Sequence, residues 1–347
     1  MTSYLPIFEV LRGETVESIH FGAAVVVDSN GNLLAWIGDP HVTTFLRSTA
    51  KPFQALPFIE RGGAQVFGLL PREIAILCAS HSGTDLHVDV VRAVQEKAGL
   101  SEDDLQCGTH PPFDKDTAER LLRNGESPTP NRHNCSGKHT GMLAHAKMRG
   151  LPLQTYLDPD HPVQQDILQT FAEMCELPPE EVKIGTDGCS APNFAVPLYN
   201  AALAYARLCD PKDLSETRAT ACKTITDAMT AHPEMISGYG RFDTRLMEVG
   251  EGKIIAKGGA EGYQGVGLMP GTLSPDSPGI GIVLKVSDGD AAKRVRPAVT
   301  LEILHRLGAL NEGQMRELAE FGPLQSVYNW RKLTVGESRP IFTLSRA

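Results

Sequence analysis

The stretch Ser48-Thr49-Ala50-Lys51 marks the point where the chain changes character. Before it lie two apolar runs, 21–27 and 33–37, separated by a turn that contains Asn30-Gly31. Because Asn-Gly suits the positive φ angles of a tight turn, these runs predict an antiparallel hairpin. From Ser48 to about residue 240 the patterns are mostly helical. We expect helices after Thr84 and over 116–123, 136–149, 162–175, 194–208 and 214–229.

Strand character returns late in the chain. The segments 253–256 and 279–286 are apolar and short, and a helix is expected over 290–307. Strands, then many helices, then strands again indicate an α+β fold rather than an alternating one. We therefore predict a single unit spanning 1–347, with a sheet part at about 1–47 and 250–347. A helical region at about 84–248 is inserted into it.

Composition excludes several classes of protein. The 347 residues carry 33 Lys and Arg against 42 Asp and Glu, a net charge of −9. This disfavours a nucleic-acid partner, whose binding relies on neutralising phosphates. No apolar run reaches the roughly 18 residues of a membrane span, and the first residues do not read as a signal peptide. Seven cysteines at irregular spacing argue against a disulfide framework. We expect a cytoplasmic protein with neither a nucleic-acid nor a membrane partner.

The opening stretch is also an S-x-x-K motif. If Ser48 opens a helix, Lys51 lies one turn later on the same face. A serine hydroxyl becomes a good nucleophile when a neighbouring base takes its proton, and a lysine in a suitable environment can do so. The tetrapeptide alone favours a plainer interpretation, in which Ser48 caps the helix and Lys51 is solvated.

Two further motifs change that balance. Ser80-His81-Ser82-Gly83 follows an apolar segment, and Lys257-Gly258-Gly259 ends a predicted strand. Each has an ordinary explanation, as a helix cap and as a strand-to-turn transition. Together they give the order S-x-x-K, S-x-S, K-x-G, which is the motif order of serine β-lactamases and penicillin-binding proteins. A serine–lysine hydrolase becomes the favoured interpretation.

Two loops contain cysteines. Asn134-Cys135-Ser136-Gly137-Lys138-His139 superficially matches a phosphate-binding loop, but Arg132 stands where glycine is required, so nucleotide binding is rejected. Asp187-Gly188-Cys189 follows a short predicted strand. Both cysteines lie in polar, Gly-rich loops, which predicts exposed thiols suited to a soft metal such as zinc. The spacing matches no standard zinc motif, and spacing alone does not predict a metal.

These stretches together resemble the L-asparaginase II family of the Rhizobium etli type. The matching segments are 47–52, 78–83, 134–139 and 185–192, extended by 257–259. The resemblance implies a serine β-lactamase-like fold, an antiparallel sheet with flanking helices and an inserted helical region. It also implies hydrolysis of L-asparagine to L-aspartate and ammonia, and a homodimer.

The resemblance assigns roles to individual residues. It pairs Ser48 with Lys51 and Ser80 with Lys257 in a double serine–lysine site. It implies that Cys135, Lys138 and Cys189 bind zinc. Asp187 then lies beside the metal and orients a water molecule bound to it. Its weakest assignment is that Arg47 or His139 contacts the substrate carboxylate. Asparaginases with threonine nucleophiles are set aside, because no Gly-Gly-Thr context lies near the start of the chain and the threonine at 186 belongs to the loop assigned to the metal.

Two alternatives remain open from sequence. One is another serine–lysine hydrolase, such as a glutaminase, an esterase or a β-lactam-binding enzyme. The other is a non-catalytic, zinc-containing binding protein on the same fold.

Overall fold

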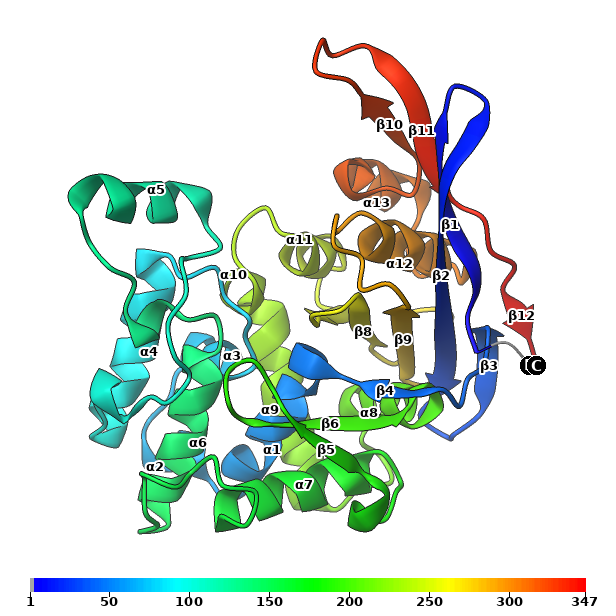
Figure 1. Ribbon diagram of the computed structural model, residues 1–347. Helices are drawn as coiled ribbons and strands as arrows, with labels where there is room; N and C mark the ends of the chain where they lie inside the picture. Colours follow the sequence, from blue (N-terminus) through cyan, green and yellow to red (C-terminus); the bar gives the residue numbers. More distant parts are fainter. Residues whose placement is uncertain (1–2) are drawn as a thin grey trace. The chain divides into compact units, whose positions relative to one another are not determined.

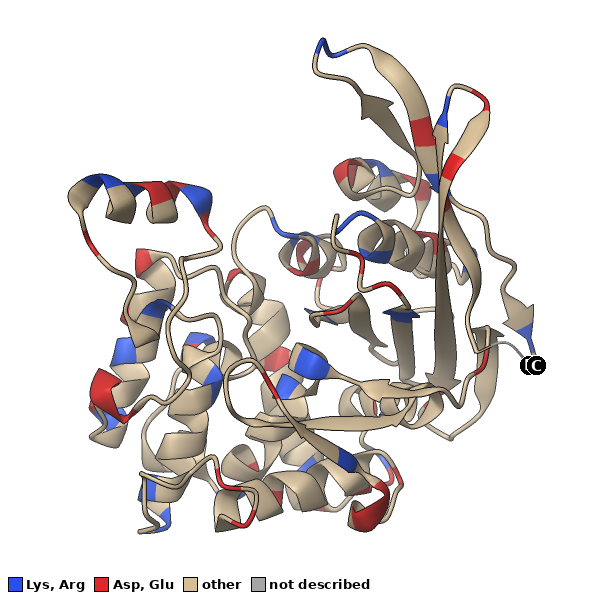
Figure 2. Ribbon diagram, in the orientation of Figure 1, with Lys and Arg blue, Asp and Glu red and all other residues tan. Residues whose placement is uncertain are grey.

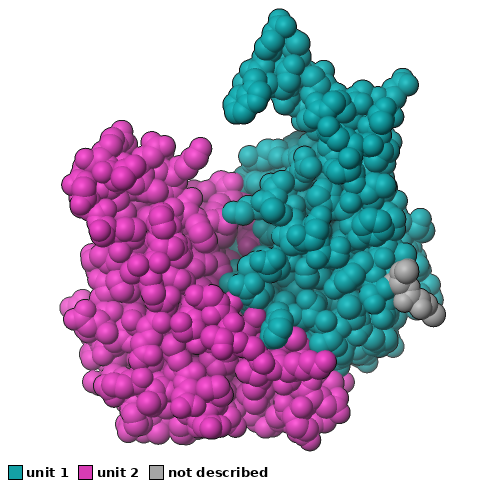
Figure 3. Space-filling view, in the orientation of Figure 1, with its two compact units in different colours: residues 1–49, 196–210, 245–347 teal, residues 50–195, 211–244 magenta. Residues whose placement is uncertain are grey.

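The computed structural model describes residues 3–347, and the chain divides into two compact units (Figure 3). Unit 1 comprises the residues up to 49, together with 196–210 and 245–347. Unit 2 comprises 50–195 and 211–244. The chain therefore enters unit 2 within the S-x-x-K motif.

Unit 1 is built on a nine-stranded antiparallel sheet (Figure 1). Its main path runs β10-β11-β1-β2-β9-β8-β7, and β3 pairs with β2 and with β12. The long strand β2 holds the middle because its C-terminal half, from Gly22 to Asp28, is buried and pairs along its length with β9. The strands are β1 (Leu5–Arg12), β2 (Thr15–Asp28), β3 (Leu33–Ile37), β7 (Ile254–Gly258), β8 (Tyr263–Leu268), β9 (Ile280–Val286), β10 (Gln325–Tyr328), β11 (Thr334–Pro340) and β12 (Ser345–Arg346), with the short β4 (Thr43–Phe45) outside this sheet.

Helices cover both faces of this sheet. Helix α8 (Leu198–Cys209) contacts β2, β8 and β9, and a Cβ at Gly281 would lie 1.7 Å from the Ala202 carbonyl oxygen, so glycine permits backbone contact there. Helix α12 (Val295–Arg306) also contacts β8 and β9, where its Arg296 bonds the Gln264 side chain. Gly265, the next residue along β8, faces α8. Because successive residues of a strand point to opposite faces of the sheet, α8 and α12 lie on opposite faces. Helix α11 (Phe242–Val249) precedes α12 in the chain and α13 (Glu312–Glu317) comes after it; both are labelled in Figure 1.

Unit 2 is mostly helical and packs around α1 (Lys51–Glu60). Every residue of α1 from Lys51 to Ile59 is buried, and the helix contacts α6, α7 and α9. Pro52 is tolerated in its first turn, where a backbone N–H has no partner within the helix. The other elements are α2 (Gly63–Val66), α3 (Pro71–Leu77), α4 (Asp85–Ala98), α5 (Lys115–Asn124), α6 (Ser136–Met148), α7 (Pro162–Met174), α9 (Glu216–Ala231) and α10 (Pro233–Ile236), with the strand pair β5 (Lys183–Thr186) and β6 (Pro192–Pro197).

The α+β class is confirmed: an antiparallel sheet with flanking helices, and a helical region inserted between its strands, as expected of a serine β-lactamase-like fold. The predicted hairpin is β2–β3, with Val25 opposite Trp36. The helix expected over 194–208 is wrong at its start, since 194–197 belong to β6 and α8 begins at Leu198. That helix lies within the predicted helical region, yet it belongs to unit 1.

Charged residues of both signs are spread over many of the helices and hairpins, and the central strands are largely uncharged (Figure 2). In the described part of the chain, no helix is both long enough and apolar enough to cross a bilayer.

Candidate active site

Lys51 opens helix α1 and is buried. Residues Arg47–Ala50 form a 3-10 turn, so Ser48 lies just before the α-helix rather than opening it. Arg47 adopts a left-handed φ of 54°, a conformation that costs a non-glycine residue energy and recurs at functional sites. Lys51 is 1% exposed, so the plainer interpretation of a solvated lysine is wrong.

The Lys51 amine meets three oxygen atoms of unit 2. Its Nζ lies 2.5 Å from the Ala79 carbonyl, 2.9 Å from Ser80 Oγ and 3.4 Å from the Asn134 carbonyl. The carbonyls only accept hydrogen bonds, whereas the Ser80 hydroxyl can donate or accept. An ammonium can donate to all three oxygens, and a neutral amine can donate to the carbonyls and accept from Ser80. A proton can therefore move between Nζ and Ser80 Oγ without leaving a carbonyl unpaired.

The loop that carries Ser80 is held from two sides. The Ser80 amide donates to the Ile236 carbonyl at 2.8 Å. On the other side, α6 lies against the end of α3, because a Cβ at Gly137 would come within 2.1 Å of the Ile76 carbonyl oxygen. This close approach places the start of α6, with Cys135 and Lys138, beside the Ser80 loop.

The three predicted metal ligands come together in unit 2. Lys138 Nζ lies 3.0 Å from Cys189 Sγ, and Cys135 interacts with Cys189. A turn between β5 and β6, closed by the Asp187 amide on the Ala191 carbonyl, presents Cys189. The exposed thiols expected from sequence are a wrong prediction, because Cys135 is 3% and Cys189 1% exposed. Polar loop sequence here reflects the tight turn rather than access to solvent.

The two thiols share a proton unequally. A hydrogen bond from the Cys189 thiol holds the pKa of Cys135 well below its ordinary value, and Lys51 and Lys138 act in the same direction. Donating that bond raises the pKa of Cys189, and burial adds to the effect. Burial disfavours the charged form of Lys138, but the neighbouring thiols outweigh it and raise its pKa. These directions favour the thiolate at Cys135 over one at Cys189 and favour the charged form of Lys138.

This donor set fits a soft ion. Zinc prefers sulfur and nitrogen ligands, and two cysteines and an amine converge here. Within residues 3–347, no group of three or more His, Cys, Asp or Glu side chains is placed to hold a metal. A metal at this position would therefore use the lysine as its third ligand, and Lys138 and Cys189 would each have to lose a proton.

Asp187 and His139 flank Cys189. Asp187 Oδ2 lies 3.7 Å from Cys189 Sγ. His139 is fully buried, and its Nδ1 lies 2.6 Å from the Tyr156 hydroxyl. Burial lowers the pKa of His139 to about 4, so its ring is neutral at physiological pH. A substrate-contact role for His139 stays a prediction.

Ser48, Lys257 and Arg47 belong to unit 1. Lys257 is fully buried at the end of β7, and its Nζ donates to the Gly258 carbonyl at 2.7 Å. A Cβ at Gly259 would lie 2.8 Å from the Leu46 carbonyl oxygen, so glycine lets this strand end lie against the segment that carries Ser48. Arg47 lies 3.9 Å from Glu261. The predicted pairs Ser48–Lys51 and Ser80–Lys257 stay predictions.

Four groups near the site could not be predicted from the sequence. The Asn134 and Ala79 carbonyls are backbone acceptors for Lys51, which side-chain patterns cannot reveal. Tyr156, buried and bonded to His139, lies in a segment without a motif. Cys107, unassigned from sequence, is buried near the thiol pair, and burial raises its pKa to about 12.

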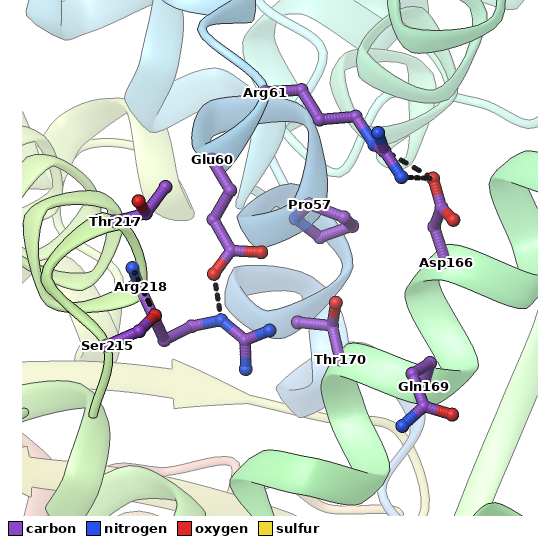
Figure 4. A pocket seen from close by; sticks show the side chains of 9 residues that line it. All are labelled: Pro57, Glu60, Arg61, Asp166, Gln169, Thr170, Ser215, Thr217 and Arg218. Atoms are coloured by element: carbon purple, nitrogen blue, oxygen red, sulfur yellow. Dashed lines mark hydrogen bonds and ion pairs between the residues drawn. The ribbon is translucent and has the colours of Figure 1, made fainter. Parts of the chain in front are cut away.

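Unit 2 also contains a hollow of about 380 Å³ between α1, α7 and α9 (Figure 4). Arg218 bonds Glu60, and Arg61 lies 3.0 Å from Asp166, so these charged side chains already neutralise one another. We interpret the hollow as a structural ion-pair network.

Comparison with protein families gives a match over most of the chain. The family model for L-asparaginase II matches residues 8–340. The comparison with curated proteins gave no match.

Solved structures resemble the chain at low identity. A Bacillus glutaminase is 12% identical, with 83% of this chain and 91% of that chain covered and a TM-score of 0.38. A probable glutaminase from Bacillus subtilis is 11% identical, with 83% and 84% covered and a TM-score of 0.40. A β-lactamase from Mycobacterium bovis is 14% identical, with 82% and 94% covered and a TM-score of 0.43. These likenesses are too distant to assign any residue of the site.

Proposed function

Because the chain belongs to the L-asparaginase II family, and is thus an amidohydrolase, we propose that it hydrolyses the side-chain amide of free L-asparagine. The products are L-aspartate and ammonia. The observation that carries the proposal is the buried Lys51 amine, 2.9 Å from the hydroxyl of the half-buried Ser80, in a chain of this family.

In the proposed mechanism, Ser48 Oγ attacks the amide carbon and Lys51 accepts its proton. Ser80 and Lys257 pass the proton to the leaving nitrogen, which departs as ammonia. Water then hydrolyses the acyl-enzyme and regenerates Ser48. Backbone N–H groups near Ser48 stabilise the oxyanion. The hydrogen bonds of Lys51 support this order of steps. Nζ and Ser80 Oγ can exchange a proton while both backbone carbonyls stay hydrogen-bonded to Nζ.

We also propose that Cys135, Lys138 and Cys189 hold zinc. A bound zinc ion would supply a Lewis acid that grips the amino and carboxylate groups of the substrate. Asp187, next to Cys189, is placed to accept hydrogen bonds at this position. Arg47 is proposed to pair with the substrate carboxylate, and its ion pair with the exposed Glu261 would then have to open.

The mechanism predicts that Ser48→Ala, which removes the nucleophile, and Lys51→Met, which removes its base, each lower kcat for ammonia release by about 10²–10⁴-fold. Ammonia is measured by a coupled assay on the full chain, with circular dichroism to confirm folding.

Lys223→Met is the matched control, because the Lys223 side chain is 74% exposed and its ion pair with Asp227 contributes little. A folded Ser48→Ala variant with a near wild-type rate would remove Ser48 from the nucleophile role.

A further inference from the structure

His81 directly follows Ser80 and is fully buried in unit 2. The Gly83 amide lies 3.1 Å from His81 Nδ1, and His81 Nε2 lies 2.9 Å from Ser136 Oγ. Burying a polar ring is costly unless its nitrogens are hydrogen-bonded, and here both are. The first contact closes the turn 80–83 on itself, and the second reaches the first residue of α6. His81 therefore links the turn 80–83 to α6.

The direction of each hydrogen bond follows from groups that can only donate or only accept. The Gly83 N–H can only donate, so His81 Nδ1 accepts. The Asn131 carbonyl can only accept, so the Ser136 hydroxyl donates to it at 2.8 Å. Ser136 Oγ still has lone pairs to accept from the remaining ring proton, on His81 Nε2. One continuous set of hydrogen bonds thus runs from the turn 80–83 to Asn131.

The far end of this set is fixed. Asn131 is 1% exposed, and its side-chain amide exchanges two hydrogen bonds with that of Gln95 on α4, at 2.7 and 3.2 Å. The Asn131 backbone N–H also donates to the Glu102 carboxylate at 2.7 Å. Because these partners come from separate segments of unit 2, Ser136 presents its oxygen to His81 from a firm support.

The ring of His81 is also held on its face. The His87 ring stacks on it, with centroids 5.1 Å apart and an angle of 15° between the planes. His87 Nε2 donates to the Glu234 carbonyl at 3.0 Å. Glu234 belongs to α10, and the Ile236 carbonyl of the same helix accepts the Ser80 amide. The orientation of the His81 ring and the backbone of Ser80 are therefore set by the same short helix.

We infer that His81 is a positioning residue that holds the turn 80–83, and with it the Ser80 hydroxyl, against the Lys51 amine through the bond to Ser136. The Lys51 amine lies 2.9 Å from Ser80 Oγ and 2.5 Å from the Ala79 carbonyl, so a small displacement of the turn separates these groups. The effect on catalysis rests on the proposed function, whereas the holding of the turn does not.

Asparagine and glutamine substitutions separate the two ring nitrogens. His81→Asn keeps an acceptor near the position of Nδ1 and loses the bond to Ser136, whereas His81→Gln keeps a donor near the position of Nε2. We expect His81→Asn to lower kcat for ammonia release from asparagine by about 10²-fold, the cost of displacing a reacting group by about 1 Å. His81→Gln should recover most of this loss. Equal losses in the two variants would contradict the role given to the Ser136 bond.

His161→Asn is the matched control. His161 is also buried in unit 2, and its Nδ1 likewise accepts the amide of the residue two positions later, Val163, at 3.2 Å. Its Nε2 donates to the Pro152 carbonyl at 3.0 Å, so His161→Asn removes a bond of the same kind from another loop. It should unfold at a lower denaturant concentration than the wild-type chain without a loss of kcat. A loss of kcat as large as that of His81→Asn would show that general stability is responsible.

Amide hydrogen exchange on the same full-length chains, measured by mass spectrometry, tests the turn without catalysis. Exchange over residues 80–83 should be faster in His81→Asn and unchanged in His161→Asn. Unchanged exchange over 80–83 in a folded His81→Asn chain overturns the inference, as does faster exchange with an unchanged kcat. If the wild-type chain releases no ammonia from asparagine, the proposed function fails, and the exchange rates alone decide whether His81 holds the turn.

Discussion

At the scale of single residues, Lys51 shows how burial and chemistry combine. Its amine is almost completely removed from solvent, and its three oxygen neighbours satisfy it in either protonation state. A buried polar group without partners would be costly, so this arrangement has to be complete for the helix to form around it. The same completeness supports the role of base proposed for Lys51.

His145 provides a test of buried charge away from the site. Burial lowers its pKa to about 3 from the ordinary 6.5, and Arg149, Arg61 and His161 act in the same direction. Asp166 lies 3.6 Å from Nε2, too far for a hydrogen bond, and burial favours the neutral form of the ring. The folded chain thus keeps this ring neutral.

We predict that the neutral ring of His145 makes unfolding pH-dependent. Below pH 6.5 the unfolded chain binds a proton that the folded chain does not, so the stabilisation is complete above pH 6.5 and declines as the pH falls toward 3. In chemical denaturation from pH 7 to 4, His145→Gln should reduce the slope of unfolding free energy against pH by up to about 1.4 kcal/mol per unit. The exposed His41→Gln should leave the slope unchanged. An unchanged slope in His145→Gln would contradict a neutral, buried ring.

The chemistry of the site was more predictable than its surroundings. The family resemblance named Cys135, Lys138 and Cys189 together, and the three side chains meet in the fold. The Ala79 and Asn134 carbonyls and the Tyr156 hydroxyl were not predicted, because backbone acceptors leave no mark on side-chain patterns and Tyr156 is brought in by tertiary packing.

At the scale of elements, the site depends on how closely α6 approaches α3. Gly137 has no Cβ, and any Cβ there would overlap the Ile76 carbonyl. The next glycine on the same helix, Gly141, faces the Leu77 side chain, where a Cβ would make an ordinary contact at 3.4 Å. Comparing alanine substitutions at Gly137 and Gly141 therefore distinguishes the effect of a clash with the backbone from the effect of helix propensity.

Gly137→Ala should destabilise the chain by about 1–3 kcal/mol in denaturant unfolding and lower activity, because the helices must separate and shift Cys135 and Lys138. Gly141→Ala should be neutral or stabilising by up to about 1 kcal/mol, since alanine is the better helix former. If both substitutions changed the free energy of unfolding equally, the close approach of the α3 backbone would not be the reason why position 137 requires glycine.

Element prediction failed where tertiary packing decided the outcome. The apolar run after Pro192 was expected to be one helix, but its first residues pair with β5 and Pro197 separates them from α8. Both the strand and the helix are buried over most of their length, so hydrophobic periodicity could not place the boundary. Strands β10, β11 and β12 carry mixed polar sequence and drew no prediction.

At the scale of the whole molecule, both ends of the described chain build one sheet. Strand β1 pairs with β11, with Phe8 opposite Pro340. Such pairing between distant segments has no local signal, so sequence predicted the class of the fold but not its strand order.

We propose that the chain forms a homodimer. Light scattering of the full chain should then give twice the chain mass of 37.5 kDa, independent of concentration in the micromolar range. A mass of a single chain under the same conditions would contradict this proposal and leave the amidohydrolase assignment intact.

The central claim is hydrolysis of free asparagine, and the comparison of asparagine with glutamine tests it most directly. Ammonia release by the purified wild-type chain should be measured with each amino acid, with L-aspartate identified as the second product. We predict turnover of L-asparagine with a kcat/KM at least about tenfold above that of L-glutamine, because a pocket that fits one amide discriminates against one more methylene by about 1–3 kcal/mol. Ammonia from glutamine alone, or from neither substrate with the zinc site filled, would contradict the account.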